Sequence, residues 1–345
     1  MKMTFRWYGE GDSIPLAYIR QIHGMSGVVT AVYDIPVGGV WPLERILHLK
    51  KLCEEQGLAM EVIESVPVHE DIKLGRPSRE GYIEAYRQTL FHLGAAGVKC
   101  VCYNFMPVFD WLRTELAAPQ PDGSTALAYR HEALLGLDVR NLHLPGWDES
   151  YTTGELNSLL DAYKGMSHRQ LFDNLIYFLR GILPACEETG IHMAIHPDDP
   201  PWDMFGLPRI ISKQSDYDNL FAALPSRHNG MTLCTGSLGA GRDNDLIALI
   251  ERYADRVHFA HIRQLKYAGE FDFTEAGHMT DKGDLDIFGV VRALVANGFD
   301  GYVRPDHGRN IWGETGKPGY GLYDRALGAA YLHGLFEAAE KLLRR

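Results

Sequence analysis

The stretch HRQLFDNLIYFLRGILPACEETGIHMAIHP, residues 168–197, contains one full step of the pattern that decides the fold. Its first part repeats apolar residues three and four positions apart, which predicts a helix with one buried stripe. Gly190 ends this helix, because glycine is the commonest residue just past a helix C-terminus. The next run, IHMAIHP, is short and apolar and predicts a buried strand. Helix, glycine and strand therefore follow one another directly.

The same alternation extends outward over nearly the whole chain. Eight strands are predicted, at residues 3–9, 27–36, 58–66, 98–106, 191–197, 230–236, 257–264 and 301–308. Helices are clearest at residues 42–57, 80–97, 168–190, 245–255, 288–298 and 323–345. Eight strand-then-helix units predict an α/β protein with a (β/α)₈ TIM barrel, and residues 1–345 are expected to form a single domain.

An open doubly wound sheet is the alternative arrangement of these elements. A dinucleotide-binding sheet of that kind is expected to carry a glycine-rich first turn, and none occurs there. The sequence has no GxGxxG motif and no P-loop. GSLGAG at residues 236–241 is a near miss, which is interpreted as a loop after the sixth strand.

Two segments are too long for ordinary connections. Residues 107–167 are expected to form a helical insertion after strand four, and residues 265–284 a long loop after strand seven. Both would emerge at the C-terminal face of the barrel, where active sites are built, so a lid is expected at 107–167.

Composition excludes several classes of protein. The 345 residues contain 34 Lys and Arg against 45 Asp and Glu, so the net charge is −11, which argues against a nucleic-acid binder. No stretch approaches the roughly 20 apolar residues of a membrane span. Five scattered cysteines do not suggest a disulfide framework. We expect a soluble cytoplasmic protein without a membrane partner.

Ligand-type residues occur where the last four strands end. His196, Cys234, His261 and Asp306 fall at the ends of strands five to eight. Consecutive strand ends form one arc of a barrel rim, so two imidazoles, a thiolate and a carboxylate can converge on a divalent metal. Taken singly, each residue has an ordinary interpretation as a core histidine, a buried thiol or a turn former. The joint arrangement favours a metal site.

Further candidates surround these ligands. His307 is a natural acid or base near neutral pH, Tyr320 has a phenol that can move a proton, and Arg309 can bind a carboxylate with two N–H groups. Arg6 on strand one adjoins strand eight in a closed barrel, and Asn104 ends strand four. These two are predicted to bind substrate, although an ion pair is an equal alternative for Arg6.

Other residues are predicted to be structural. His258, three positions before His261, should point away from the site. Cys100 and Cys102 share one strand face and are expected to pack in the core.

Several long motifs together resemble those of mannonate dehydratases. They are FRWYG (5–9), IHPDDPP (195–201), TLCTGSLG (232–239), FAHIR (259–263), RPDHGR (304–309) and PGYGLYDRALG (318–328). The resemblance implies a xylose-isomerase-like barrel, dehydration of D-mannonate to 2-keto-3-deoxy-D-gluconate in hexuronate breakdown, and Mn²⁺ bound by the four ligands named above. It also implies that His307, Arg309 and Tyr320 surround the reacting substrate, and that the protein is a homo-oligomer, by default a dimer.

The residues leave some points open. Either His307 or Tyr320 can remove the C2 proton, and a thiolate ligand also suits Fe²⁺ or Zn²⁺. A metal-dependent sugar isomerase or epimerase on the same barrel is the nearest alternative, but such enzymes use sites richer in carboxylates. An endonuclease conflicts with the negative charge. A non-catalytic sugar-acid binder should lack the acid and base residues.

Overall fold

A closed barrel of eight parallel strands forms the centre of the molecule in the computed structural model, which describes residues 1–135 and 152–343. The strands follow the order β1-β12-β9-β8-β7-β4-β3-β2 around the barrel. Their bounds are β1 (Lys2–Arg6), β2 (Met25–Thr30), β3 (Ala59–Glu64), β4 (Cys100–Tyr103), β7 (His192–Ile195), β8 (Asn229–Cys234), β9 (Val257–Ile262) and β12 (Tyr302–Pro305). Each of these strands overlaps one of the eight predicted strands, so the predicted barrel is confirmed.

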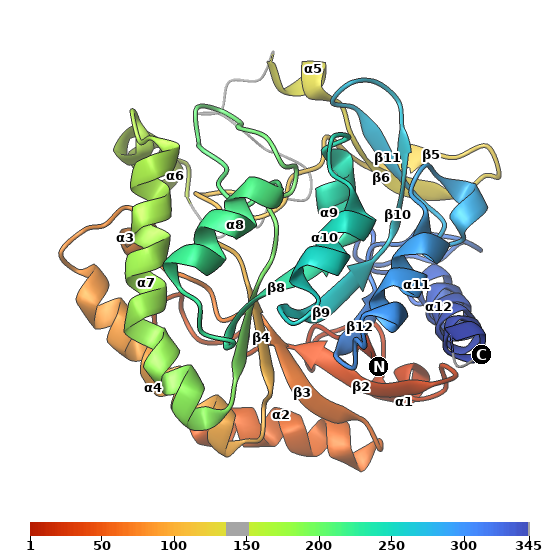
Figure 1. Ribbon diagram of the computed structural model, residues 1–345, viewed down its shortest axis with the longest axis horizontal. Coiled ribbons are helices and arrows are strands. Elements are labelled where there is room, and N and C mark those ends of the chain that lie inside the picture. Colours follow the sequence, from red (N-terminus) through yellow and green to blue (C-terminus); the bar gives the residue numbers. More distant parts are fainter. Residues whose placement is uncertain (136–151, 344–345) are drawn as a thin grey trace.

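Helices surround the barrel (Figure 1). Their bounds are α1 (Leu16–Ile19), α2 (Leu43–Glu55), α3 (Glu70–Lys73), α4 (Arg79–Ala95), α7 (His168–Thr189), α8 (Gln214–Ala223), α9 (Thr235–Ala240), α10 (Leu246–Tyr253), the 3₁₀ turn η2 (Thr280–Lys282), α11 (Ile287–Ala296) and α12 (Tyr323–Leu343). In α7 a capping box of Ser167 and Gln170 starts the helix, and Gly190 ends it with φ of 71°.

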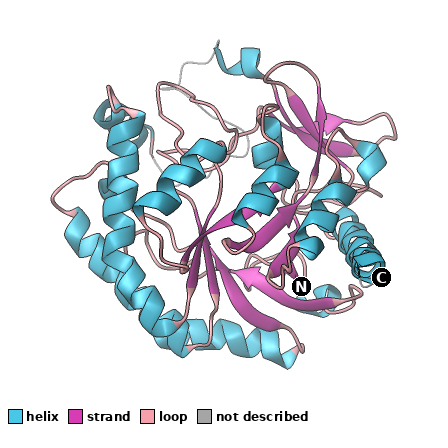
Figure 2. Ribbon diagram, in the orientation of Figure 1, coloured by secondary structure: helices cyan, strands magenta, loops and turns pink. Residues whose placement is uncertain are grey.

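The two insertions contain strands that the sequence did not predict, although the first also contains helices, as expected. The first contains β5 (Glu115–Pro119) and β6 (Thr125–Tyr129) as well as α5 (His131–Leu135) and α6 (Thr153–Tyr163), and its residues 136–151 lie outside the described residues. The second contains β10 (Gln264–Tyr267) and β11 (Phe273–Ala276). These four strands form a separate sheet in the order β10-β11-β6-β5, which Figure 2 shows beside the barrel. Pairing between β6 and β11 is remote in sequence, so neither insertion reveals it alone.

The interior of the barrel is a small apolar cluster below the strand ends. It consists of Val29, Val62, Cys100, Cys102, Ala194, Phe259 and Tyr302. Cys100 and Cys102 both pack in this cluster, as predicted, and Cys102 also lies with Glu64 and His261 in a group whose donor atoms are within 4.8 Å of one another. His258 lies near the amino end of β9, away from the carboxyl ends of the strands. Its ring is 4.2 Å from that of His192, and its Nε2 is hydrogen-bonded to the carbonyl of Arg227 at 2.9 Å. Burial and its histidine neighbours lower the pKa of His258 to about 3.

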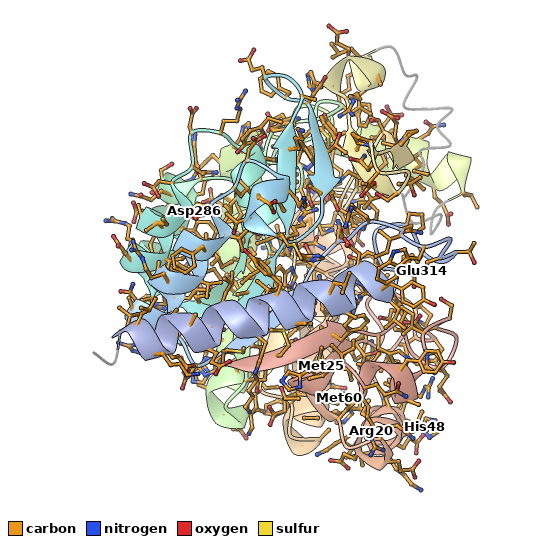
Figure 3. All side chains as sticks on the ribbon, turned by 90° about the vertical axis from the view of Figure 1, so that its right-hand side faces the viewer. Arg20, Met25, His48, Met60, Asp286 and Glu314 are labelled. Atoms are coloured by element: carbon orange, nitrogen blue, oxygen red, sulfur yellow. The ribbon has the colours of Figure 1, made fainter. Side chains whose placement is uncertain are left out.

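The last helix is anchored at its start by an acidic side chain. The carboxylate of Glu314 accepts hydrogen bonds from the backbone N–H groups of Leu322 and Tyr323, and Figure 3 shows Glu314 at that end of α12. Negative charge at this position also suits the helix dipole. Within the described part of the chain, no helix is both long enough and apolar enough to cross a membrane.

Candidate active site

Four ligand-type side chains lie at the carboxyl ends of four neighbouring strands. Cys234 ends β8 and pairs in register with His261 on β9. His196 and Asp306 directly follow β7 and β12. One donor atom from each of His196, Cys234 and His261 lies within 4.8 Å of the other two, and Sγ of Cys234 is 3.7 Å from Oδ2 of Asp306. The structure thus brings together all four residues predicted to bind metal.

The free atoms of this cluster suit a metal ion. Nδ1 of His196 donates to the carbonyl of Pro197 at 2.7 Å, so Nε2 remains available. Nε2 of His261 is buried and makes no hydrogen bond within the described residues. Two imidazole nitrogens, a thiolate and a carboxylate are ligands that divalent transition metals accept. The residues therefore fit a metal of this class.

Buried cations keep the sulfur and the carboxylate in their charged forms. Burial by itself raises the pKa of Cys234, but Arg263 and His196 lower it by more than burial raises it. The net pKa therefore lies well below the usual range of a thiol. Burial likewise opposes ionisation of Asp306, but Arg304, His307 and Arg263 hold the pKa of its carboxyl well below the usual range. Both side chains can therefore act as anionic ligands.

His307 and Tyr320 form a hydrogen-bonded pair beside this cluster. Nε2 of His307 lies 2.8 Å from the phenol oxygen of Tyr320, and both residues are buried. On the other side of the ring, Nδ1 lies 2.8 Å from Oε1 of Glu275 and 2.8 Å from Nη1 of Arg263. Nδ1 can donate to the carboxylate or accept from the guanidinium. The ring therefore keeps a hydrogen-bond partner at Nδ1 whether this atom carries a proton or not.

A buried ion network supports the histidine. Arg113 from the first insertion contacts Asp199 at 2.9 Å and Glu275 at 2.7 Å, and Arg263 contacts the same two carboxylates. The sequence reasoning did not single out Arg113, Arg263 or Glu275. Arg263 stands two positions after His261, so strand alternation could have placed it on the same face. Arg113 and Glu275 lie in the insertions and have no comparable signal.

A cavity of about 590 Å³ opens beside the cluster. Arg6 and Arg304 line it, and Nη1 of each is buried without a hydrogen-bond partner in the described residues. Nη2 of Arg304 lies 3.1 Å from Glu64 and 2.8 Å from Asp306. Asn104 also lines the cavity, and its Oδ1 accepts from the N–H of Met106 at 3.2 Å. Unpaired guanidinium N–H groups are suited to binding the carboxylate of a substrate.

Arg309 differs from the expectation that it faces the substrate. Its guanidinium binds Asp324 of α12 at 2.9 Å and Asp122 in the β5–β6 turn at 2.6 Å, and it is not among the residues that line the cavity. Arg309 lies beyond the end of β12, where strand alternation no longer fixes the direction of a side chain. The buried carboxylate of Asp324 needs a cation nearby, which explains this orientation.

Comparisons with known proteins cover the whole chain. The family model described as D-mannonate dehydratase (UxuA) matches residues 1–345. Mannonate dehydratase 2 of Halalkalibacterium halodurans is 51% identical over 342 residues, which are 98% of this chain and 99% of that protein. The crystal structure of mannonate dehydratase from Streptococcus suis serotype 2 has a TM-score of 0.92 and 48% identity, and the match covers 100% of this chain and 95% of that one.

A more distant structure shares the fold only. D-psicose 3-epimerase from Clostridium cellulolyticum H10, solved with D-tagatose, has a TM-score of 0.57 and 14% identity, with 100% of this chain and 98% of that chain covered. This likeness supports the eight-stranded barrel fold and carries no information about the reaction.

Proposed function

The chain belongs to the D-mannonate dehydratase family, and from this premise we infer that it is a hydro-lyase that converts D-mannonate to 2-keto-3-deoxy-D-gluconate and water. The observation that carries the proposal is the convergence of His196, Cys234, His261 and Asp306 beside the His307–Tyr320 pair. The proposed metal site therefore lies next to two groups able to transfer protons.

The four converging side chains are the proposed ligands of a divalent metal. When bound, such an ion supplies Lewis-acid stabilisation of negative charge on substrate oxygens. The donor set suits Mn²⁺, Fe²⁺ and Zn²⁺ alike, so it does not choose among these ions. We propose Mn²⁺ because of the resemblance to mannonate dehydratases. Metal replacement distinguishes these ions.

The cationic wall of the cavity is the proposed binding site for the carboxylate of the sugar acid. Arg6 and Arg304 supply the unpaired N–H groups, and they replace Arg309 in this role because Arg309 is engaged by Asp324 and Asp122. Positive charge at this position also stabilises the enediolate that develops when the proton next to a carboxylate is removed. Asn104 is proposed to hydrogen-bond a hydroxyl group of the substrate.

His307 and Tyr320 are the proposed proton-transfer residues. In the dehydration, the C2–H bond breaks and the C3–O bond breaks, a proton joins the departing hydroxyl to form water, and the resulting enol tautomerises to the 2-keto acid. One group must accept the C2 proton and one must protonate the leaving oxygen, because hydroxide is a poor leaving group. A hydrogen-bonded imidazole and phenol can divide these two tasks, and the proton can return between them over 2.8 Å.

Residues 107–167 are proposed to act as a lid. Asp110, Trp111 and Leu116 from this insertion line the cavity, so the segment already forms part of its wall. Excluding water from the site would strengthen its electrostatic interactions. We further propose a cytoplasmic homo-oligomer, by default a dimer; all five cysteines are buried free thiols, which suits a reducing compartment.

The decisive experiment is turnover of D-mannonate by chelator-treated protein, with and without added Mn²⁺, while the 2-keto-3-deoxy acid is detected. We expect no turnover after chelation and recovery with Mn²⁺. Parallel additions of Fe²⁺ and Zn²⁺ test the choice of metal. Full activity of a metal-free preparation, or no product with any divalent metal, would overturn the proposal.

A further inference from the structure

Residues from opposite sides of the barrel line the cavity. Arg304 belongs to β12, whereas Asn104 and Asp110 follow β4 and line the same cavity. In the closed order of eight strands, β4 stands four places from β12, so the two strands are diametrically opposite. An extended substrate that places one end near Arg304 therefore points its other end toward the segment after β4.

Among the described residues that line the cavity, Asp110 is the carboxylate that forms no ion pair with another described residue. The other four acidic residues in its lining have basic partners: Glu64 with Arg304, Glu70 with Lys73, Asp199 with Arg113 and Arg263, and Asp306 with Arg304 and Arg263. No described residue forms an ion pair with Asp110, and its side chain is exposed to the cavity.

An amide and two cationic side chains act on the carboxyl group of Asp110. The side chain of Asn104 lies next to this carboxyl group and favours its charged form. Oδ1 of Asn104 is itself held by the N–H of Met106, which leaves the amide N–H₂ as the donor toward Asp110. Desolvation by the surrounding protein raises the pKa of Asp110, and the charges of Lys73 and Arg209 oppose that rise without cancelling it. The side chain thus presents acceptor oxygens to whatever enters this end of the cavity.

We propose that Asp110 is a specificity-determining residue that accepts hydrogen bonds from the polyol end of the substrate and rejects a second carboxylate there. This inference rests on the proposed function. Sugar hydroxyls are donors and match a carboxylate, whereas a terminal carboxylate has no proton to donate and carries the same charge. The site should therefore select aldonates, with one acidic end, over aldarates, with two.

The size of the preference for aldonates over aldarates follows from the repulsion between Asp110 and a second substrate carboxylate. For two carboxylates about 5 Å apart at an effective dielectric constant of about 20, the repulsion corresponds to roughly 250-fold in affinity. Partial screening reduces it to about tenfold. The preference for the aldonate should thus lie between these limits.

The test compares D-mannonate with D-mannarate, which differs by a carboxylate at C6 and has two ends that are equivalent by symmetry. kcat/KM is measured for both compounds, and D-mannarate is also measured as a competitive inhibitor of D-mannonate turnover. The proteins are the metal-loaded wild type, Asp110→Asn, Asp110→Ser and, as a control for the change in net charge, Asp243→Asn. Asp243 is exposed and does not line the cavity.

We expect kcat/KM of the wild type and of Asp243→Asn to be higher for D-mannonate than for D-mannarate by about tenfold or more. Both Asp110 variants should lose most or all of this preference. Tighter inhibition by D-mannarate in the Asp110 variants would support the same conclusion. If the wild type turns over D-mannonate but both Asp110 variants keep the wild-type ratio of kcat/KM for the two compounds, the role of Asp110 is overturned and the proposed function stands. The same holds if the wild type itself shows no preference for D-mannonate over D-mannarate. Absence of wild-type turnover would instead overturn the proposed function.

Discussion

Replacing Tyr320 by phenylalanine should separate catalysis from folding. The change removes one hydroxyl group, which lies 2.8 Å from Nε2 of His307, and leaves the ring in place. The ring keeps its contacts with His307, at 4.8 Å between centroids, and with Tyr8, at 5.1 Å. Packing around position 320 is therefore preserved.

The expected losses differ in size. Removing a neutral hydrogen bond should lower the free energy of unfolding by about 1 kcal/mol. Removing a group that transfers a proton in the transition state should lower kcat by about 10²- to 10⁴-fold, equivalent to roughly 2.7–5.5 kcal/mol. KM and the amount of bound metal should change little, because the phenol is not among the proposed ligands.

The assay is steady-state turnover of D-mannonate by Tyr320→Phe, together with metal content and thermal unfolding. Tyr331→Phe is the matched control, since the hydroxyl of Tyr331 hydrogen-bonds Thr280 at 2.8 Å and is absent from the lining of the cavity. The control should lose a similar amount of stability and retain its kcat. If Tyr320→Phe kept kcat within about threefold of the wild type with metal bound, the phenol would have no role in proton transfer.

Three further predictions concern the ligands, the rim and the opposite end of the barrel. Cys234→Ser should lower the metal content retained after dialysis at least about tenfold, because a hydroxyl group does not supply the thiolate charge; unchanged content by elemental analysis would remove Cys234 from the ligand set. Arg309→Gln should lower the free energy of unfolding by about 2–3 kcal/mol, since it leaves the buried carboxylate of Asp324 without its cation, and a KM for D-mannonate raised more than about tenfold would instead place Arg309 at the substrate. His258 has a pKa of about 3 in the folded protein and about 6.5 in the unfolded chain, so the unfolded chain takes up this proton first as the pH falls. The free energy of unfolding should therefore decrease by about 2 kcal/mol between pH 6.5 and pH 5. The free energy of unfolding, measured by urea titration at each pH, should depend less steeply on pH in His258→Gln than in the wild type. An identical pH dependence would contradict this assignment.

Much of the candidate site could be predicted because strand ends of a barrel share one rim. His196, Cys234, His261 and Asp306 each lie at the end of a strand whose apolar run is visible in the sequence. Strand alternation and the closed strand order then bring them together without any further information. The same reasoning could have included Arg263, which the FAHIR motif already contained.

The sequence by itself determined the barrel, its eight strands and the residues at the ends of those strands, because these depend on local periodicity and on a topology with few alternatives. Only the tertiary structure decided the partners of His307 and of Arg309. Glu275 and Arg113 come from two insertions far apart in the chain, and they meet because β6 and β11 pair in the second sheet. Arg309 turned toward Asp324 because a buried carboxylate requires a cation, and which cation it finds depends on the packing of α12. Such ion pairs form between side chains with no fixed spacing in the sequence, so only the folded structure reveals them.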